Sequence, residues 1–269
     1  MFIYFFTKEK CLDLLKLEIK IRLPEFKLSF GHKGFVTYKV PEKFDENFFE
    51  TFSPFFAYTW GKTFKEPIDS GLIRFELNKN VVFYGEDRNH FHEKFNLFQV
   101  YDETLPADCP SRAYLKLKDA QKFFTLDFCS NESILEWGCA PGGMSFFLLN
   151  QNLKVTGVDA GLMSDKILAH DEFSFYQMSV HDFLPKTQQT TFDYLISDLN
   201  LPPKDVIDLI LNALEIIQIK KMILVHLKCN GEKDLKAICN ISKKFSNYQI
   251  NRQMLPSHGR ETLITLNPI

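Results

Sequence analysis

The stretch Ile134-Leu135-Glu136-Trp137-Gly138-Cys139-Ala140-Pro141-Gly142-Gly143-Met144-Ser145 joins a short apolar run, an acidic residue and a turn of small residues. Such a pattern is typical of a buried strand that passes into a helix where a ligand approaches the backbone. We therefore expect a nucleotide-type cofactor loop. Taken alone, the pattern is equally compatible with an ordinary strand-to-helix turn.

The glycine spacing narrows the class of loop. Gly138, Gly142 and Gly143 do not fit G-x-G-x-x-G, which excludes the dinucleotide dehydrogenase fingerprint. The form E-x-G-x-A-P-G-G instead resembles the first motif of S-adenosylmethionine-dependent methyltransferases, in the variant of the FtsJ-like ribose 2′-O-methyltransferases. The resemblance implies that the loop holds the methionine part of the cofactor and that Glu136 pairs with its ammonium group. The cofactor-binding residues predicted here are Glu136, Gly138, Cys139, Ala140, Pro141, Gly142, Gly143 and Met144.

Composition places the chain among globular proteins of one large or two modest domains. It has 269 residues, 45% hydrophobic and 25% charged, with a net charge of −2. Before Pro106 the chain has 15 basic residues (Lys and Arg) and 16 acidic residues (Asp and Glu); from Pro106 on it has 17 basic and 18 acidic residues. Tight sequence-independent RNA binding needs a basic excess, which neither half has. One local basic patch, equally compatible with a solvated helix face, comprises Arg112, Lys116, Lys118 and Lys122.

Cysteine and hydropathy patterns bear on compartment and metal binding. The six Cys show no C-x-x-C pair and no zinc spacing. The apolar run Met1–Phe6 is too short for a signal peptide, and no stretch has the length needed to span a bilayer. We therefore expect reduced thiols, a cytoplasmic protein and no membrane partner. His90 and His92 lack a third candidate ligand, so no metal site is predicted.

The first part of the chain alternates in the order β-α-β-β-α-β, which predicts a small ferredoxin-like α+β domain. A hairpin follows, with Asn78-Lys79-Asn80 as its turn. The polar, turn-rich segment 87–108 marks a boundary near residue 105, so we assign residues 1–105 to this domain. The predicted strands are 2–6, 26–30, 35–40, 56–64, 72–77 and 81–84, and the predicted helices are 11–19 and 48–56.

Residues 106–269 alternate strand and helix, which predicts a parallel, doubly wound sheet with its ligand at the carboxyl ends of the strands. A helix is expected after a Ser111 cap. Two final strands without an intervening helix indicate an antiparallel edge hairpin. The predicted fold is thus α/β, a Rossmann-like methyltransferase sheet beside the smaller N-terminal domain. The predicted strands are 154–158, 173–178, 194–197, 222–228, 248–254 and 262–266, and the predicted helices are 162–170, 205–217 and 232–245.

Charged residues close three of these apolar strands. Asp159 follows the glycine loop by about twenty residues, a spacing at which a carboxylate accepts both ribose hydroxyls of a bound adenosine. Asp198 and Lys228 end two later strands, where a charge is costly unless it is paired or useful. Each of these two, taken alone, is also compatible with a solvated strand end.

Together with Lys116 and Glu261, Asp198 and Lys228 resemble the Lys-Asp-Lys-Glu tetrad of the FtsJ-like family. The resemblance implies an S-adenosylmethionine-dependent RNA ribose 2′-O-methyltransferase in which these four residues are catalytic and Asp198 also contacts the cofactor. It extends through the second half of the chain. The matching motifs are Ser111–Leu117, the loop 136–143, Val158-Asp159, Ser197-Asp198, Leu227-Lys228 and Arg260-Glu261.

Two segments, Leu105–Arg112 and Val158–Met163, are most similar to the bacterial subgroup that methylates a cytidine ribose in large-subunit ribosomal RNA. This implies ribosomal RNA as the partner. Members of the subgroup carry a larger N-terminal RNA-binding region, whose first, ferredoxin-like part Gly34–Tyr38 and Phe52–Ala57 resemble. The THUMP-type portion is absent here or reduced to the hairpin. The RNA target therefore stays open, as does an alternative, a non-catalytic RNA- or ribosome-binding protein that retains the methyltransferase fold.

The tetrad implies a mechanism. A ribose hydroxyl is a very weak acid and needs a base within hydrogen-bond reach that is neutral at the working pH. Lys228 is the expected base, with a pKa lowered by burial and by Lys116. Asp198 would orient Lys228, and Glu261 would hold Lys116 or the ribose. Positioning then supplies most of the acceleration, without a metal.

The remaining candidates each have an ordinary structural explanation. Ser179 and Asp182 follow the third strand, where many methyltransferases bind the adenine amine, so both are included among the cofactor-binding residues. His226 in an apolar strand indicates a core histidine. Cys229 suggests cytosine-C5 chemistry, but the expected Pro-Cys near Asp198 is missing. The segment 200–203, Asn-Leu-Pro-Pro, is similar to the Asn-Pro-Pro-aromatic motif of amino-methylating enzymes, which a leucine interrupts here.

Overall fold

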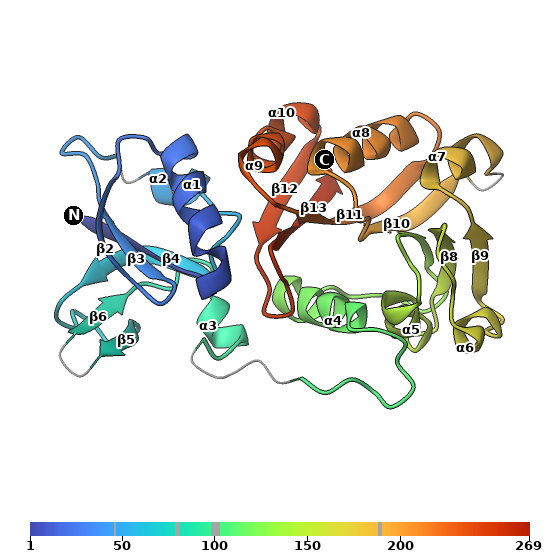
Figure 1. Cartoon of the computed structure of the whole chain (residues 1–269), viewed down its shortest axis with the longest axis horizontal. Helices are drawn as coiled ribbons and strands as arrows, with labels where there is room; N and C mark the ends of the chain where they lie inside the picture. The colour runs from blue at the N-terminus through green and yellow to red at the C-terminus, as the bar shows by residue number, and fades with distance from the viewer. Residues whose placement is uncertain (46, 79–80, 98–102, 188–189) are drawn as a thin grey trace. The chain divides into compact units, whose positions relative to one another are not determined.

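The computed structural model describes residues 1–45, 47–78, 81–97, 103–187 and 190–269. The chain forms two compact units (Figure 1). The N-terminal unit is Met1–Val100 together with Arg252–Arg260, and the C-terminal unit is Tyr101–Asn251 together with Glu261–Ile269. A single boundary near residue 105 does not describe this division, because a segment late in the chain belongs to the first unit.

The N-terminal unit is built on an antiparallel sheet with the strand order β2-β3-β1-β4-β6-β5. Its first six main elements follow the predicted order β-α-β-β-α-β, although α2 is a single turn where a longer helix was predicted. The predicted hairpin is present as β5 and β6, and part of its turn lies outside the described residues. The elements are β1 (Phe2–Phe6), η1 (Glu9–Cys11), α1 (Leu12–Arg22), β2 (Lys27–His32), β3 (Phe35–Lys39), α2 (Phe48–Thr51), β4 (Thr59–Phe64), β5 (Ile73–Asn78), β6 (Val81–Gly85) and α3 (Phe91–Lys94).

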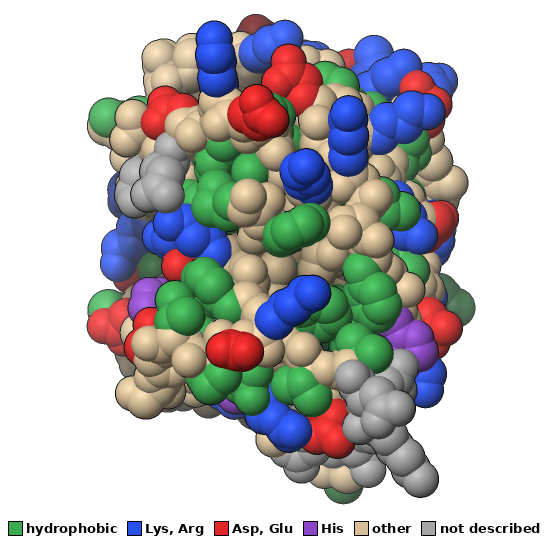
Figure 2. Space-filling view, turned by 90° about the vertical axis from the view of Figure 1, so that its left-hand side faces the viewer, with side chains coloured by type: hydrophobic (Ala, Val, Ile, Leu, Met, Phe, Trp, Pro, Cys, Tyr) green, Lys and Arg blue, Asp and Glu red, His purple; other side chains and the backbone are tan. Residues whose placement is uncertain are grey.

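Aromatic side chains fill both sides of this sheet and account for many of the chain's 28 Phe. On one side, Phe75 packs with its ring centroid 4.9 Å from those of Tyr4 and Phe35. On the other side, Phe5 stacks on Trp60 at 6.4 Å. Figure 2 shows one face of the unit, on which hydrophobic, basic and acidic side chains are interspersed, as the balanced charge count predicts.

The C-terminal unit contains a sheet of order β12-β13-β11-β10-β7-β8-β9. The pairs β11–β10, β10–β7, β7–β8 and β8–β9 are parallel, and β13 runs antiparallel to β11. The predicted doubly wound, Rossmann-like sheet with an antiparallel edge is confirmed. The strands are β7 (Ser133–Trp137), β8 (Lys154–Asp159), β9 (Phe173–Gln177), β10 (Thr191–Ser197), β11 (Gln218–Lys228), β12 (Tyr248–Gln253) and β13 (Glu261–Pro268).

Helices cover both faces of this sheet, with α4 and α5 on one side and α8 and α9 on the other (Figure 1). Helix α6 is shorter than the predicted helix 162–170, the predicted helix 232–245 is interrupted at Asn240, and α7 was not predicted. None of the described helices is long and apolar enough to cross a membrane. The helices are α4 (Ala113–Phe124), α5 (Gly143–Leu149), α6 (Asp165–Leu168), α7 (Val180–Phe183), η2 (Leu184–Lys186), α8 (Pro203–Leu214), α9 (Glu232–Cys239) and α10 (Ile241–Lys244).

The start of α4 differs in detail from the prediction. Arg112, not Ser111, occupies the N-cap position, and its side chain makes no capping hydrogen bond. The Ser111 hydroxyl instead accepts a hydrogen bond of 3.4 Å from the backbone N–H of Ala113. This helix carries Lys116 toward the carboxyl edge of the sheet.

Candidate active site

Gly138 brings two strand ends together. Its φ is +75°, and a Cβ atom there would lie 2.9 Å from the carbonyl carbon and oxygen of Asp198. The backbone N–H of Asp198 donates a 3.0 Å hydrogen bond to the carbonyl of Trp137, at the end of β7. Only glycine allows this close approach at a positive φ. The loop after β7 and the loop after β10 are therefore in direct contact.

Gly142 and Gly143 serve helix packing. Gly142 has a φ of +112°, and a Cβ there would lie 2.7 Å from the side chain of Ile167 on α6. A Cβ at Gly143 would lie 2.2 Å from the hydroxyl and 2.7 Å from the carbonyl oxygen of Ser111. These glycines thus let α5 begin close to α6 and to the start of α4. The sequence suggests a cofactor role for them, whereas the structure supplies a packing reason.

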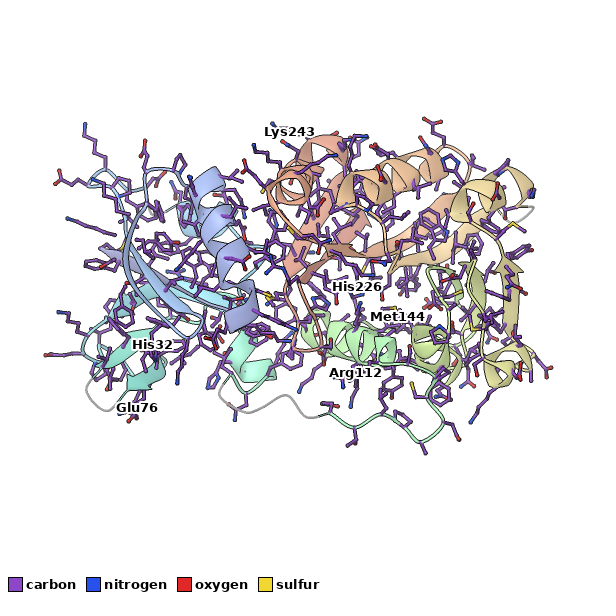
Figure 3. The ribbon with its side chains drawn as sticks, in the orientation of Figure 1. His32, Glu76, Arg112, Met144, His226 and Lys243 are labelled. Atoms are coloured by element: carbon purple, nitrogen blue, oxygen red, sulfur yellow. The ribbon has the colours of Figure 1, made fainter. Side chains whose placement is uncertain are left out.

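The other small or apolar members of the loop are mainly interior. Cys139 is 3% exposed and Met144, on α5 (Figure 3), is 2% exposed. Burial raises the pKa of the Cys139 thiol well above its usual range. Both side chains therefore pack behind the loop, and the thiol is neutral at physiological pH.

A cavity of about 700 Å³ lies at the carboxyl edge of the sheet. Six of the residues predicted to bind or react line it, namely Gly138, Ala140, Asp159, Ser179, Asp198 and Lys228. The other predicted residues, Glu136, Cys139, Pro141, Gly142, Gly143, Met144, Asp182, Lys116 and Glu261, are outside that lining. The cavity is thus bordered by Asp159 at the end of β8, by Asp198 after β10 and by Lys228 at the end of β11.

Asp159 is held by backbone amides. Its Oδ2 accepts a 3.0 Å hydrogen bond from the N–H of Ala140, and its Oδ1 accepts a 2.7 Å hydrogen bond from the N–H of Gly161. A carboxylate oxygen has two lone pairs, so each oxygen can accept one further donor. This geometry leaves the carboxylate fixed in direction and still able to bind a pair of hydroxyls.

Glu136 lies behind the cavity wall, 2% exposed. Its Oε2 accepts a 2.7 Å hydrogen bond from the Ser145 hydroxyl on α5. Burial is the main cause that raises the pKa of Glu136 to about 8, and the negative charges of Asp198 and Asp159 add to the rise against the opposing Ser145 bond. The carboxyl group is therefore largely protonated at neutral pH, unless a cation approaches it.

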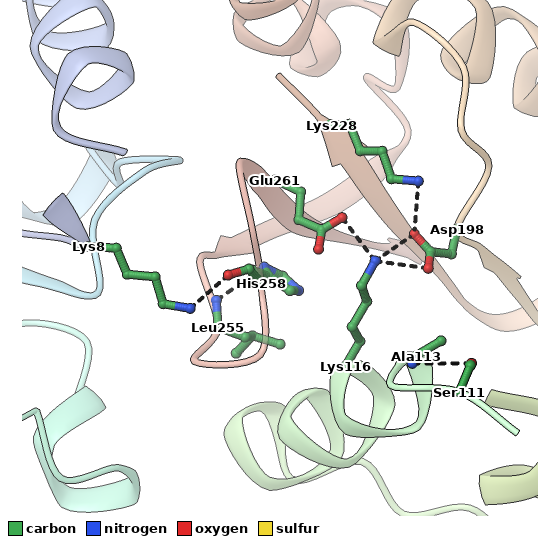
Figure 4. A network of polar contacts seen from close by, with 9 residues as sticks. All are labelled: Lys8, Ser111, Ala113, Lys116, Asp198, Lys228, Leu255, His258 and Glu261. Carbon is green, nitrogen blue, oxygen red and sulfur yellow. Dashed lines mark hydrogen bonds and ion pairs between the residues drawn. The ribbon is translucent and has the colours of Figure 1, made fainter. Parts of the chain in front are cut away.

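Lys116 stands at the centre of the predicted tetrad (Figure 4). Its Nζ lies 2.9 Å from both carboxylate oxygens of Asp198 and 3.0 Å from Oε2 of Glu261. All three side chains are at most 15% exposed. Burial by itself lowers the pKa of Lys116, but the two carboxylates outweigh it and the pKa is raised. Lys116 is therefore a permanent cation.

The Lys228 side chain is more exposed than that of Lys116. Its Nζ lies 3.8 Å from Oδ1 of Asp198, and its side chain is 29% exposed and lines the cavity. Opposite it in the antiparallel pair of β11 and β13 is Glu261. Burial raises the pKa of the Asp198 carboxyl, and the nearby ammonium groups oppose that rise. The four residues of the tetrad lie together, with Lys228 as the lysine that faces the cavity.

The structure shows the contacts of the remaining candidate residues. Ser179 caps α7. Its hydroxyl accepts a hydrogen bond from the N–H of Asp182 and donates one of 2.7 Å to the Asp182 carboxylate, so these two side chains are hydrogen-bonded to each other. Among the remaining candidates, His226 is fully buried within β11 (Figure 3), as predicted. His90 contacts Glu93 at 3.0 Å. No cluster of three His, Cys, Asp or Glu suited to a metal occurs within the described part of the chain.

Sequence reasoning missed several residues of the cavity. They follow strand ends already identified, so proximity along the chain could have indicated Met178 and His181 after β9 and Asn200 and Leu201 after β10. Ala113 at the start of α4 has no such signal. The lining residues not predicted are Ala113, Val158, Ala160, Met178, Val180, His181, Leu199, Asn200, Leu201 and Leu209.

The sheet order and the cavity at its carboxyl edge define the class as Rossmann-like methyltransferases. Within that class, the chain belongs to the FtsJ-like methyltransferase family, whose sequence model matches residues 109–255. FtsJ-like methyltransferases use S-adenosylmethionine. The prediction of the family from the loop and the later motifs is confirmed.

Individual relatives match part of the chain. The ribosomal RNA large subunit methyltransferase M of Aggregatibacter aphrophilus is 28% identical over 51% of this chain and 39% of its own length. The protein of the same name from Marinobacter nauticus is 31% identical over 37% of this chain and 29% of its own. The chain therefore spans well under half of these relatives. A solved candidate hemolysin from Lactococcus lactis, 20% identical over 60% of this chain and 89% of that one, has a TM-score of 0.51, which supports the fold alone.

Proposed function

We propose that this protein is an S-adenosylmethionine-dependent RNA ribose 2′-O-methyltransferase that acts on ribosomal RNA. The observation that carries the proposal is the grouping of Lys116, Asp198, Lys228 and Glu261, of which Asp198 and Lys228 line the cavity. The names of the relatives support ribosomal RNA as the substrate. Such an enzyme would work in the cytoplasm, and the N-terminal unit, which the sequence predicts to be ferredoxin-like, would position the RNA.

The cavity has the groups that S-adenosylmethionine requires. Bound there, the cofactor supplies an electrophilic methyl group. Asp159 is aimed by two backbone amides and can accept both ribose hydroxyls. Glu136, buried beside the loop, can pair with the ammonium group when it loses its proton. Gly138 and Ala140 leave the cavity wall open for the methionine part.

The two lysines have different tasks. Lys116 is held by two carboxylates that raise its pKa, so it keeps its proton and supplies a fixed positive charge. Lys228 reaches the cavity, with its Nζ 3.8 Å from Oδ1 of Asp198, and in its neutral form it is the group that takes the proton from the ribose hydroxyl. Asp198 contacts both lysines and orients them relative to each other. Glu261 completes the support of Lys116.

The test is methyl transfer to ribosomal RNA or ribosomal particles with labelled cofactor, followed by mapping of the product. Lys228→Ala should lower kcat by about 10²–10⁴-fold, the usual contribution of a general base. Lys233→Ala, a change at an exposed lysine on α9, is the matched control and should leave kcat unchanged. A methylated base, or undiminished ribose methylation in Lys228→Ala, contradicts the proposal. Binding of RNA and cofactor without any transfer would favour the non-catalytic alternative.

A further inference from the structure

Gly143 begins α5 at a point where the neighbouring helix α4 leaves no room for a side chain. A Cβ atom there would lie 2.7 Å from the carbonyl oxygen of Ser111 and 3.0 Å from the backbone nitrogen of Tyr114. Both are backbone atoms at the start of α4, so no rotation of a side chain relieves the contact. Ordinary van der Waals contact begins at 3.4 Å, so a methyl group at Gly143 would displace the carbonyl of Ser111 by about 0.7 Å.

The backbone conformation of Gly143 does not explain the glycine. Among the described glycines, those with a positive φ are Gly34, Gly138 and Gly142, whereas Gly143 is the first residue of a helix. Alanine suits a helical conformation better than glycine does. The requirement for glycine at this position is therefore one of space beside α4.

Aromatic side chains hold the two helices together next to this contact. The ring of Tyr114 on α4 lies edge-on to that of Phe147 on α5, with 5.2 Å between the centroids, and 6.2 Å from that of Phe146. Such ring pairs favour a fixed relative orientation. The position of α4 is thus set by a close backbone approach at Gly143 and by the Tyr114 ring.

The same helix carries Lys116 into the tetrad, as Figure 4 shows. The Nζ atom lies 2.9 Å from both carboxylate oxygens of Asp198 and 3.0 Å from Oε2 of Glu261. These two partners follow β10 and begin β13, so the sheet and not α4 determines where they lie. A displacement of α4 therefore moves the base of the lysine side chain relative to both carboxylates.

From this geometry we propose that Gly143 is a positioning residue for Lys116, because its lack of a side chain lets α4 lie where the lysine meets Asp198 and Glu261. All these residues belong to the C-terminal unit. Gly143 is not among the residues that line the cavity, whereas Gly138 is. The last glycine of the loop therefore serves the catalytic lysine and not the cofactor. The inference rests on the proposed function of the tetrad.

The first test compares kcat with cofactor affinity in the full chain. Gly143→Ala should lower kcat about tenfold, since a misplacement of about 1 Å costs up to about 10²-fold, and should leave the Kd for S-adenosylmethionine unchanged. Gly231→Ala is the matched control, because Gly231 also precedes a helix and a Cβ there would meet nothing within 4 Å. Equal kcat in the two variants overturns the proposal. A rise in Kd as large as the fall in kcat also overturns it, because Gly143 would then act on the cofactor.

A pair of changes at Tyr114 covers the case in which Gly143→Ala does not fold. Tyr114→Ala removes the ring that packs on Phe147, so α4 loses part of its support, and kcat should fall about threefold to tenfold at an unchanged Kd. Tyr114→Phe keeps the ring and should keep kcat. If these two variants have the same kcat, the packing of α4 on α5 does not position Lys116.

The second test needs no activity. Trace labelling with acetic anhydride reports the availability of each lysine amine, with the exposed Lys233 as the internal reference. Glu261→Gln, the positive control, should raise the labelling of Lys116 about threefold, the equivalent of one hydrogen bond. Gly143→Ala, or Tyr114→Ala in its place, should raise it in the same direction, and Gly231→Ala should not.

The labelling separates the two ways of failing. If the wild-type protein methylates no RNA, the proposed function fails, and the labelling alone decides whether Gly143 positions Lys116. Labelling of Lys116 that is the same in Gly143→Ala and in the wild type contradicts the positioning role, whatever the activity.

Discussion

The carboxyl groups that lie in or behind the two ends of the cavity wall are held in different ways. Toward β7 and β8, Glu136 accepts from the Ser145 hydroxyl and Asp159 accepts from backbone amides. Toward β10 and β13, Asp198 and Glu261 accept from the Lys116 ammonium. One end therefore uses neutral donors, whereas the other uses a cation.

The difference determines which ligand charge each end can accept. Neutral donors orient Glu136 and Asp159 without supplying a positive charge, so this end favours a cationic or hydroxyl-bearing ligand. In the proposed reaction, Lys228 takes the proton of the ribose hydroxyl as a neutral amine. With that proton in place, two ammonium groups balance the two carboxylates of the tetrad, so the transfer leaves no excess negative charge on these four side chains.

The largest expected effect comes from breaking the tetrad end at Asp198. Asp198→Asn keeps the shape but removes the charge that Lys116 contacts at 2.9 Å through both oxygens and Lys228 at 3.8 Å. We expect kcat to fall by about 10³-fold, comparable with the loss of a preorganised electrostatic group. Steady-state methyl transfer at saturating cofactor measures it.

Asp171→Asn, at an exposed position before β9, is the control for the charge change and should leave kcat unchanged. If Asp198→Asn retains more than a tenth of the wild-type kcat, the tetrad end does not depend on the Asp198 charge. The contrast between the two ends of the cavity would then have no catalytic meaning.

A second prediction concerns the opposite end of the cavity, where Asp159 lies. Asp159→Ala should weaken S-adenosylmethionine binding by about 30–150-fold, because two hydrogen bonds of about 1–1.5 kcal/mol each are lost. The kcat at saturating cofactor should change little. Calorimetric titration gives the Kd. Asp171→Ala is the matched control, since that exposed carboxylate does not line the cavity, and the Kd should be unchanged.

The sequence predicts the strand ends well because the relevant signal is local. Asp159, Asp198 and Lys228 each close an apolar run, and alternation of strand and helix brings such ends to one edge of a parallel sheet. The doubly wound sheet and the family follow from these patterns and are confirmed. The grouping of Lys116 with Asp198 and Glu261 was expected from the resemblance, not from any local pattern.

What could not be predicted depends on distant contacts. Asp13 and Arg260 are 247 positions apart, so no local pattern assigns the segment before Glu261 to the N-terminal unit. The sequence alone predicts Gly143 to be part of a ligand loop. Its close approach to Ser111 is a tertiary contact, which no local pattern shows. Helix α7 is one turn long and too short to show a periodicity.

A third prediction tests whether the Glu136 carboxyl group meets a cation. Its pKa is raised to about 8, so the group is largely protonated at pH 6.5, where an amino group of pKa about 7.7–8.0 is still charged. Pairing with that ammonium requires Glu136 to lose its proton. Cofactor binding at pH 6.5 should therefore release about one proton, and affinity should rise by about tenfold per pH unit below pH 7. Calorimetry in two buffers of different ionisation enthalpy measures the release.

Glu136→Gln should abolish the proton release and weaken binding, whereas release of no proton by the wild type would mean that Glu136 only braces the loop through Ser145. Stability gives an independent check of sign. Because the folded pKa lies above the ordinary value of 4.5, the contribution of Glu136 to stability is full below that value and is lost as the pH rises through about 8. The Tm of Glu136→Gln minus the Tm of the wild type should therefore increase as the pH is raised from 5 to 9.

The smallest expected effect concerns the Ser145 hydroxyl, which donates to Glu136 at the β7 end of the cavity. Ser145→Ala removes the 2.7 Å hydrogen bond that lowers the pKa of Glu136, so that pKa should rise further. Ionising Glu136 for a cationic ligand then costs more, and cofactor affinity at pH 7 should fall about threefold to tenfold, the worth of one hydrogen bond. Ser174→Ala, an exposed change on β9, is the control for the lost hydroxyl. The fall should shrink at pH 9, where Glu136 is largely ionised without help. A loss of affinity that does not depend on pH would instead mean that Ser145 acts by packing α5 and not through the charge of Glu136.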